Sequence, residues 1–166
     1  MINTWINIET GLYPNENEAI WMYDAESKSV WLGSLCYLED EGWFWTISNG
    51  IIYAEDGMIK TETILSDNDM RVTHWCQIPK LKDFISIRKT GMYPIKDEIV
   101  WMYNEKTNFI CLGSHTYLED IGWVWTVSCD KTIYNEDGEI KVEAEYDGDY
   151  DITHWFPLPS LPKDEK

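Results

Sequence analysis

Two histidines, His74 and His154, are the residues whose type and spacing best suit chemistry. Each lies in a Thr-His-Trp motif, and the two motifs are 80 residues apart. A histidine in such a motif can serve as a metal ligand or a general base. Neither has a second His or Cys at the spacing of a zinc site. We therefore interpret both as structural residues that hold a backbone carbonyl or pack on the adjacent Trp, and keep them as candidate binding residues.

Each half of the chain also contains a Ser, an Asp and a His that can be compared with a catalytic triad: Ser34, Asp40 and His74, then Ser114, Asp120 and His154. A triad is defined by geometry, and no nucleophile-elbow motif surrounds either serine. We assign no catalytic residue, and a hydrolase or metal enzyme that uses the repeated histidines stands as one alternative.

The acidic run Asp147-Gly148-Asp149-Tyr150-Asp151 resembles part of a calcium loop. It lacks the Gly and the distal Glu of the full pattern, so we interpret it as a solvated acidic loop. Asp147, Asp149 and Asp151 stay candidate binding residues. Since no phosphate loop, dinucleotide fingerprint or zinc signature occurs, we expect no cofactor and no metal.

The formal net charge is −17. Nucleic-acid phosphates and anionic membranes both require Lys and Arg, so the charge excludes direct binding to either. Two interpretations stay open: the acidity keeps the protein soluble, or it attracts a protein partner with a basic surface.

The sequence gives three indications of compartment. No apolar run reaches the ~20 residues that a bilayer crossing needs, and the first residues do not resemble a secretory signal. The four cysteines are Cys36, Cys76, Cys111 and Cys129, and no two of them occupy equivalent places in the two halves. We expect reduced thiols in a cytoplasmic protein.

The chain is a tandem duplication. Residues 10–48 match residues 90–128 at an offset of 80, which slips to 81 at the Glu-Asp-Gly block and returns to 80 at Thr-His-Trp. Near the start the offset is 79. Slips of this kind indicate loop insertions. The period is too long for a solenoid, so we predict two domains, 1–83 and 84–166, related by a pseudo-twofold axis.

Each domain reads as short antiparallel strands between turns, an all-β fold or a β-rich α+β fold. Strands are predicted at 19–24, 29–37 and 43–48 and their repeats, with final strands at 72–76 and 152–156. The segment 139–146 alternates as a strand does. Two Asp-Gly pairs, Asp56-Gly57 and Asp137-Gly138, predict hairpin turns. Gly33 inside a strand indicates a bulge or a close backbone approach.

The ten tryptophans are unusual for a chain of this length. Alternation places Trp43 and Trp45, and their repeats Trp123 and Trp125, on one strand face, where we expect core. Trp31 aligns with Cys111 and so is not a duplicated core position. We take Trp31 as a candidate binding residue, because an exposed aromatic ring can stack on a ligand.

Both halves share an aromatic-Ile-x-Ile opening, a following Pro, a central Trp and a closing Thr-His-Trp-x-x-x-Pro. This layout resembles domain of unknown function 551, a family of small phage- and prophage-associated proteins that end in a Thr-His-Trp-Met-Pro-Leu-Pro-like motif. The match is best at residues 153–159, and the first half lacks the first proline. The resemblance implies a phage or prophage origin, hence the host cytoplasm, and a small β-rich fold. It implies no activity.

The leading hypothesis from the sequence is a non-enzymatic binding protein that acts by protein–protein contacts, in its sharpest form the inhibition of a basic host defence or nucleic-acid-binding protein. The alternatives are a small-ligand binder that uses aromatic pockets, and the enzyme considered above.

Overall fold

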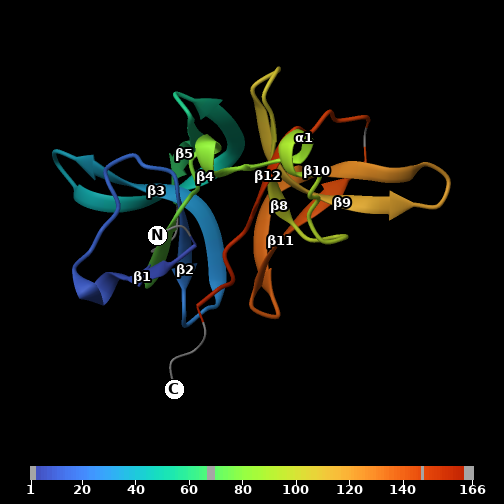
Figure 1. Ribbon diagram of the computed structural model, residues 1–166. Helices are drawn as coiled ribbons and strands as arrows, with labels where there is room; N and C mark the ends of the chain where they lie inside the picture. The colour runs from blue at the N-terminus through green and yellow to red at the C-terminus, as the bar shows by residue number, and fades with distance from the viewer. Residues whose placement is uncertain (1–2, 67–69, 147, 163–166) are drawn as a thin grey trace.

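Each half of the chain forms one six-stranded antiparallel sheet (Figure 1). The computed structural model describes residues 3–66, 70–146 and 148–162, without the side chains of 129–132. The first sheet contains β1 (Trp5–Asn7), β2 (Ile20–Asp24), β3 (Ser29–Leu38), β4 (Gly42–Glu55), β5 (Met58–Leu65) and β6 (His74–Gln77). The second contains β7 (Ile85–Ser86), β8 (Val100–Asn104), β9 (Phe109–Leu118), β10 (Gly122–Glu136), β11 (Glu139–Glu145) and β12 (His154–Pro157). The predicted all-β class is confirmed.

The two sheets have the same strand order. The first runs β1-β6-β2-β3-β4-β5, and the second runs β7-β12-β8-β9-β10-β11. Between them lies η2 (Leu81–Asp83), where the sequence predicts the domain boundary. The final strands begin two residues later than predicted. The Thr before each His bonds through both its N–H and its hydroxyl to the carbonyl of Tyr23 in β2 or Tyr103 in β8. In the described part of the chain, no helix has the length and apolar character that a membrane crossing requires.

The length differences between the repeats fall at irregular places. In η1 (Ile8–Thr10) the N–H of Gly11 bonds to the carbonyl of Ile8, whereas α1 (Ile87–Thr90) is one residue longer and its bond runs from Gly91 to Ile87. The second slip lies in a bulge of the long strand, between residues 48 and 52 in β4 and between 128 and 133 in β10. A bulge or a terminal turn absorbs one residue without changing the register of the paired strands.

Both Asp-Gly pairs form the predicted hairpin turns. Asp56 and Gly57 have φ of 52° and 75°, and the second-half pair has 53° and 81°. Positive φ at both central positions is the geometry of a type I′ turn, whose twist matches that of the flanking strands. Each turn joins the long bulged strand, β4 or β10, to the strand at the edge of its sheet, β5 or β11.

Gly33 and Gly113 confirm the predicted close approach. A Cβ on Gly33 would lie 1.9 Å from the carbonyl oxygen of Thr46 and 2.4 Å from Cε of Met22, and one on Gly113 would lie 2.0 Å from the Thr126 carbonyl oxygen. Neither glycine needs a positive φ; what each needs is space. The paired strands β3 and β4, and likewise β9 and β10, can approach each other this closely only where a side chain is missing.

The two sheets bury one shared core between them. All five residues of β2 are buried, and alternate side chains of this strand serve different cores. Trp21 and Tyr23 point into the shared core, together with residues of the second half, whereas Ile20 and Met22 pack inside their own half against Trp75. The second half has its own equivalent cluster around Met102 and Trp155. The halves are therefore joined through a common interior.

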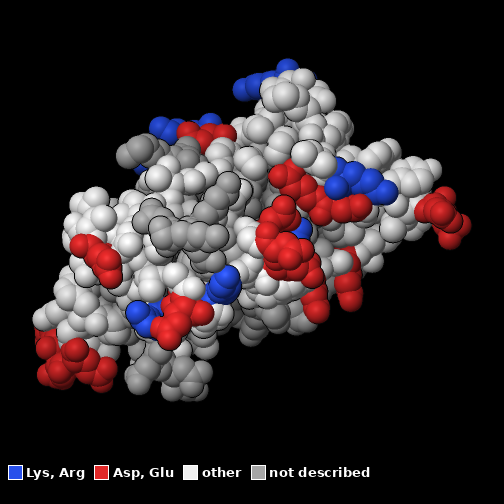
Figure 2. Space-filling model, turned by 90° about the horizontal axis from the view of Figure 1, so that it is seen from below, with Lys and Arg blue, Asp and Glu red and all other residues white. Residues whose placement is uncertain are grey.

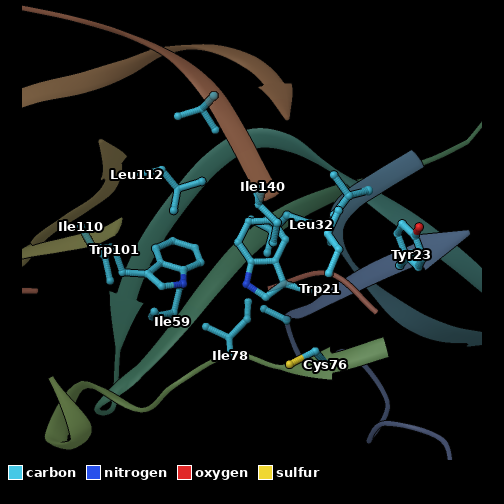
Figure 3. Packing of buried hydrophobic residues seen from close by; sticks show 14 of the residues in the cluster. Trp21, Tyr23, Leu32, Ile59, Cys76, Ile78, Trp101, Ile110, Leu112 and Ile140 are labelled. Atoms are coloured by element: carbon cyan, nitrogen blue, oxygen red, sulfur yellow. The ribbon is translucent and has the colours of Figure 1, made fainter. Parts of the chain in front are cut away.

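Trp21 and Trp101 occupy the centre of this shared core (Figure 3). They are equivalent residues of the two repeats, both have no exposed surface, and their ring centroids are 5.7 Å apart. Their indole nitrogens lie on the sides of the rings that face each other (Figure 3). Neither buried N–H has a hydrogen-bond acceptor among the described residues. The pair contributes through packing.

Two polar contacts between the halves are reciprocal. Asn108 donates from its side-chain amide to the carbonyl of Ala54 at 2.9 Å, and Asn135 donates to the carbonyl of Lys28 at 3.0 Å. Asn108 and Lys28 are equivalent positions, as are Asn135 and Ala54. Two positions that each contact the other's equivalent are the signature of an isologous interface, the arrangement of a twofold dimer.

The expectation that the four paired tryptophans lie mostly in the core is wrong for two of them. Trp125 is buried and Trp45 is half-buried, but Trp43 is 58% exposed and Trp123 is 56% exposed. Each exposed Trp does lie on the predicted strand face. However, it is next to the hairpin turn, where the strands extend beyond the layer that covers the rest of that face.

Replacement of Trp21 tests whether its role is packing. We expect Trp21→Ala to lower the free energy of unfolding by about 3–5 kcal/mol, because it leaves a cavity at the centre of the molecule. Trp21→Phe keeps a ring and removes an N–H without an acceptor, so its cost should be less than half of that. The measurement is urea unfolding. Equal costs for the two variants would show that the N–H makes a stabilising bond.

Replacement of Gly33 tests the close approach of β3 and β4. In Gly33→Ala, the new methyl group would overlap the Thr46 carbonyl, so β3 and β4 must separate, and we expect a loss of about 1–3 kcal/mol. Gly148→Ala is the matched control, because a Cβ there meets no atom within 4 Å. The two are compared by thermal unfolding. A Gly33→Ala protein as stable as the control would contradict the close approach.

Candidate functional site

The Thr-His pair of each repeat ties the final strand to a turn. The hydroxyl of Thr73 lies 2.9 Å from Nδ1 of His74 and 3.0 Å from the carbonyl oxygen of Tyr23, and it accepts from the N–H of Ala25 at 2.9 Å. The second half repeats these contacts, with the Thr153 hydroxyl 2.9 Å from Nδ1 of His154, 3.1 Å from the Tyr103 carbonyl and 2.9 Å from the Glu105 N–H. Each histidine ring also packs on a tyrosine, at 6.2 Å and 6.0 Å between centroids.

The Trp of each motif holds a loop. Trp75 donates its indole N–H to the carbonyl of Leu12 at 3.0 Å, and Trp155 donates to the carbonyl of Met92 at the same distance. These bonds fix the loops that carry Tyr13 and Tyr93. The whole Thr-His-Trp motif thus has structural contacts in both halves. Each His contacts a Thr hydroxyl and a Tyr ring, whereas the sequence interpretation named a backbone carbonyl or the adjacent Trp. His154 also lines a cleft of about 640 Å³ between the halves.

The residues compared with a triad are directed to other partners. The hydroxyl of Ser34 is 2.8 Å from that of Thr46, inside the β3–β4 ladder. Asp40 is exposed in the turn between β3 and β4, whereas His74 lies on β6 and bonds to Thr73. Ser114 and Thr126 form the same buried pair as Ser34 and Thr46, also at 2.8 Å. The serine–threonine pair is a repeated ladder contact.

The two described aspartates of the acidic run are exposed. Asp149 accepts a hydrogen bond from the hydroxyl of Tyr146 at 3.1 Å, and Asp151 lies 3.7 Å from the ammonium of Lys106. Asp147 lies outside the described residues. Among the residues described, no three His, Cys, Asp or Glu side chains come together as a metal site would require.

A groove of about 670 Å³ runs between the halves. Trp31 lines it from the first half, and Phe109 and Tyr150 line it from the second. The rings of Phe109 and Tyr150 are stacked, with their centroids 5.4 Å apart. The lining also includes Ser48 and Ser128. Trp31 is half-buried and lines this groove.

Cys111 occupies the place of Trp31 in the second half, and it lines the same groove. Burial raises the pKa of its thiol well above the ordinary range, and burial likewise raises the pKa of Cys76 to about 12. Since the thiolate is the reactive form, both behave as apolar side chains. Cys36, Cys76 and Cys111 are free thiols.

The turns joining β3 to β4 and β9 to β10 carry exposed aromatic pairs, which we name the first and second tips. The first tip consists of Tyr37, Trp43 and the turn 38–42. The second consists of Tyr117, Trp123 and the turn 118–122. In each, the Tyr lies directly across the ladder from the Trp, with ring centroids 5.2 Å and 5.6 Å apart.

The tips share one turn geometry. The N–H of Glu41 bonds to the carbonyl of Leu38 at 3.2 Å, and Gly42 follows with φ of 83°. The second tip has the same bond from Ile121 to Leu118, with Gly122 at 95°. A positive φ at this place closes a three-residue hairpin loop and favours glycine. The turn exposes Glu39 and Asp40, or Glu119 and Asp120, beside the aromatic pair.

The second tip has a further aromatic residue. The ring of His115 stacks between Tyr93 and Trp123, at 4.9 Å and 4.8 Å, and it lies 4.6 Å from Trp125. The first half has Leu35, which is buried, at the equivalent position. Burial lowers the pKa of His115 below its ordinary value, because desolvation disfavours the charged ring.

The sequence interpretation did not include the tips among the candidate sites. The signal that could have found them is a Trp directly after a Gly that closes an acidic turn, since such a residue lies at the end of its strand. In the view of Figure 2, acidic side chains lie at both ends of the molecule and also over its middle. The tips therefore combine exposed aromatic rings with negative charge.

Comparison with protein families, with curated proteins and with solved structures finds no match to this chain.

The stacked position of His115 predicts an acid-side loss of stability. Because the folded pKa is below the unfolded value of about 6.5, the unfolded chain takes up the proton first as the pH falls, so this residue destabilises the fold below that pH. We expect His115→Leu to lose less stability than the unchanged protein between pH 7.5 and pH 5.5. The measurement is denaturant unfolding followed by Trp fluorescence. Parallel pH profiles would contradict the assignment.

Proposed function

We propose that this protein is a non-enzymatic binding protein that acts through protein–protein contacts made by its two tips. The observation that carries the proposal is the exposure of Trp43 and Trp123, equivalent residues that leave more than half of their side-chain surface in solvent. Tyr37 and Tyr117 beside them are 46% and 48% exposed.

Exposed aromatic residues of this kind suit an interface. Trp and Tyr are enriched among the residues that dominate binding energy, because they bury a large area with few rotatable bonds. At the tips each Trp is held against a cross-strand Tyr. The rings are therefore ordered before binding, which reduces the entropy lost on association.

The charge around the tips selects a basic partner. Residues 29–48 and 107–128, which contain the two hairpins, include no Lys or Arg. Complementary charge speeds association and excludes acidic surfaces. Such binding weakens as salt is added.

The resemblance to domain of unknown function 551 suggests where the partner is found. A phage- or prophage-derived protein acts on host proteins, and basic host proteins include those built to hold nucleic acid. We propose a host defence protein or another nucleic-acid-binding protein as the target, which this protein inhibits by covering the basic surface.

A second candidate function is the binding of a small ligand in the groove between the halves. Trp31, Phe109 and Tyr150 supply aromatic surface from both halves, and a cavity of about 670 Å³ is the size of a small-molecule site. The ligand of such a groove would be apolar or aromatic, with the hydroxyl groups of Ser48 and Ser128 within the same lining.

The test is capture of host proteins on the immobilised chain, after nuclease treatment. We expect a basic protein that is retained at low salt and released at high salt. Loss of one dominant aromatic contact costs about 2 kcal/mol or more, about 30-fold in affinity. The double variant Trp43→Ala/Trp123→Ala should therefore lose the retained protein.

Two matched variants separate the candidates. Tyr53→Ala/Tyr134→Ala removes a duplicated pair of exposed aromatics that lies away from the tips, and it should retain the partner. Trp31→Ala changes the groove and the cluster on which Trp31 packs, both away from the tips, and should also retain it. Retention that survives the tip variant would refute the proposal. Retention lost only with Trp31→Ala would favour the groove.

A further inference from the structure

The two tips share most of one chemical environment, although only in the second does a further ring, His115, stack on the Trp. In each, an exposed indole lies next to a turn that presents a Glu and an Asp, and a cross-strand Tyr holds the indole in place. In the part of the chain that the structure describes, the ion pairs with Lys or Arg use carboxylates outside the two tips, among them those of Glu55 and Asp151. No Lys or Arg within either hairpin competes for the tips.

The group that fits both components of this environment is a guanidinium. Its planar face stacks on an aromatic ring, and its N–H groups donate in pairs to a carboxylate. An ammonium group is more strongly hydrated and does not stack as a plane, so it fits the indole less well. The chemistry of the tips thus distinguishes arginine from lysine, although both carry the same charge.

The tips lie at opposite ends of the molecule. In Figure 1 the β3–β4 hairpin reaches one side and the β9–β10 hairpin reaches the other, and both ends carry acidic side chains in Figure 2. The reciprocal contacts at the interface fix the halves back to back. One compact partner segment therefore meets only one tip.

We propose that each tip binds an arginine side chain of the partner, stacked on Trp43 or Trp123 and paired with the carboxylates of the adjacent turn, so that one chain engages two arginine-bearing segments. This inference rests on the proposed function, because it names the group that the tips recognise. The complex then contains two copies of the partner, or a partner with two equivalent arginine sites.

The experiment uses a capped pentapeptide, Gly-Arg-Gly-Arg-Gly, and its Lys counterpart, titrated into the full chain at low salt. The indole N–H signals of the ¹⁵N-labelled protein report each Trp separately. Trp43→Ala and Trp123→Ala assign the two tip signals by their disappearance. We expect the Arg peptide to shift both tip signals and to leave those of Trp21 and Trp101 in place.

The single variants and the Lys peptide complete the test. Trp43→Ala should remove one site and leave the shift of Trp123, so the stoichiometry falls from two to one. The Lys peptide should bind about two- to fivefold more weakly, the difference that a stacked guanidinium contributes. Equal shifts with both peptides would overturn the inference, since they indicate general charge attraction. Unshifted tip signals would overturn it as well.

The two proposals can fail separately. If the tip variant abolishes capture of the partner but the Arg peptide shifts neither tip signal, the protein–protein function stands and arginine recognition is wrong. If the peptide shifts both signals but capture survives the tip variant, the tips bind arginine and the proposed function is wrong.

Discussion

The burial of two apolar sheet faces against each other, with Trp21 and Trp101 at their centre, is the interaction on which the rest of this structure depends. Each half has about 80 residues, and chains of that size bury a smaller share of their surface than longer chains do. Joining the halves gives both a larger interior. Because each of Trp21 and Trp101 has its equivalent as its neighbour, the interface is built like that of a twofold dimer within one chain.

This arrangement determines where function can lie. The inner faces of both sheets are used in the shared core, and the centres of the outer faces carry the clusters around Met22 and Met102. The groove between the halves and the hairpin ends are left. At the ends the strands extend past the layers that cover them, so aromatic residues which would elsewhere be core are exposed to solvent. In the function proposed above, the acidic turns give these exposed rings a preference for cationic partners.

The Thr-His-Trp motif, which attracts attention as possible chemistry, instead connects these parts. Its Thr and His hold the turn after β2 or β8, and its Trp holds the loop that carries Tyr13 or Tyr93. In the second half that loop places Tyr93 against His115 and so completes the aromatic stack at the second tip. The motif is repeated because each half needs the same connection.

The duplication, most of the strands, the two Asp-Gly hairpins and the space needed at Gly33 were predictable from the sequence. Each of these depends on local backbone geometry or on comparison of the two halves. Only the tertiary structure decided which aromatic residues face solvent. Trp43 and Trp45 share a strand face, two residues apart, yet one is exposed and the other half-buried. Alternation assigns a residue to a face, but burial depends on how far the opposing layer extends, and contacts distant in sequence set that limit.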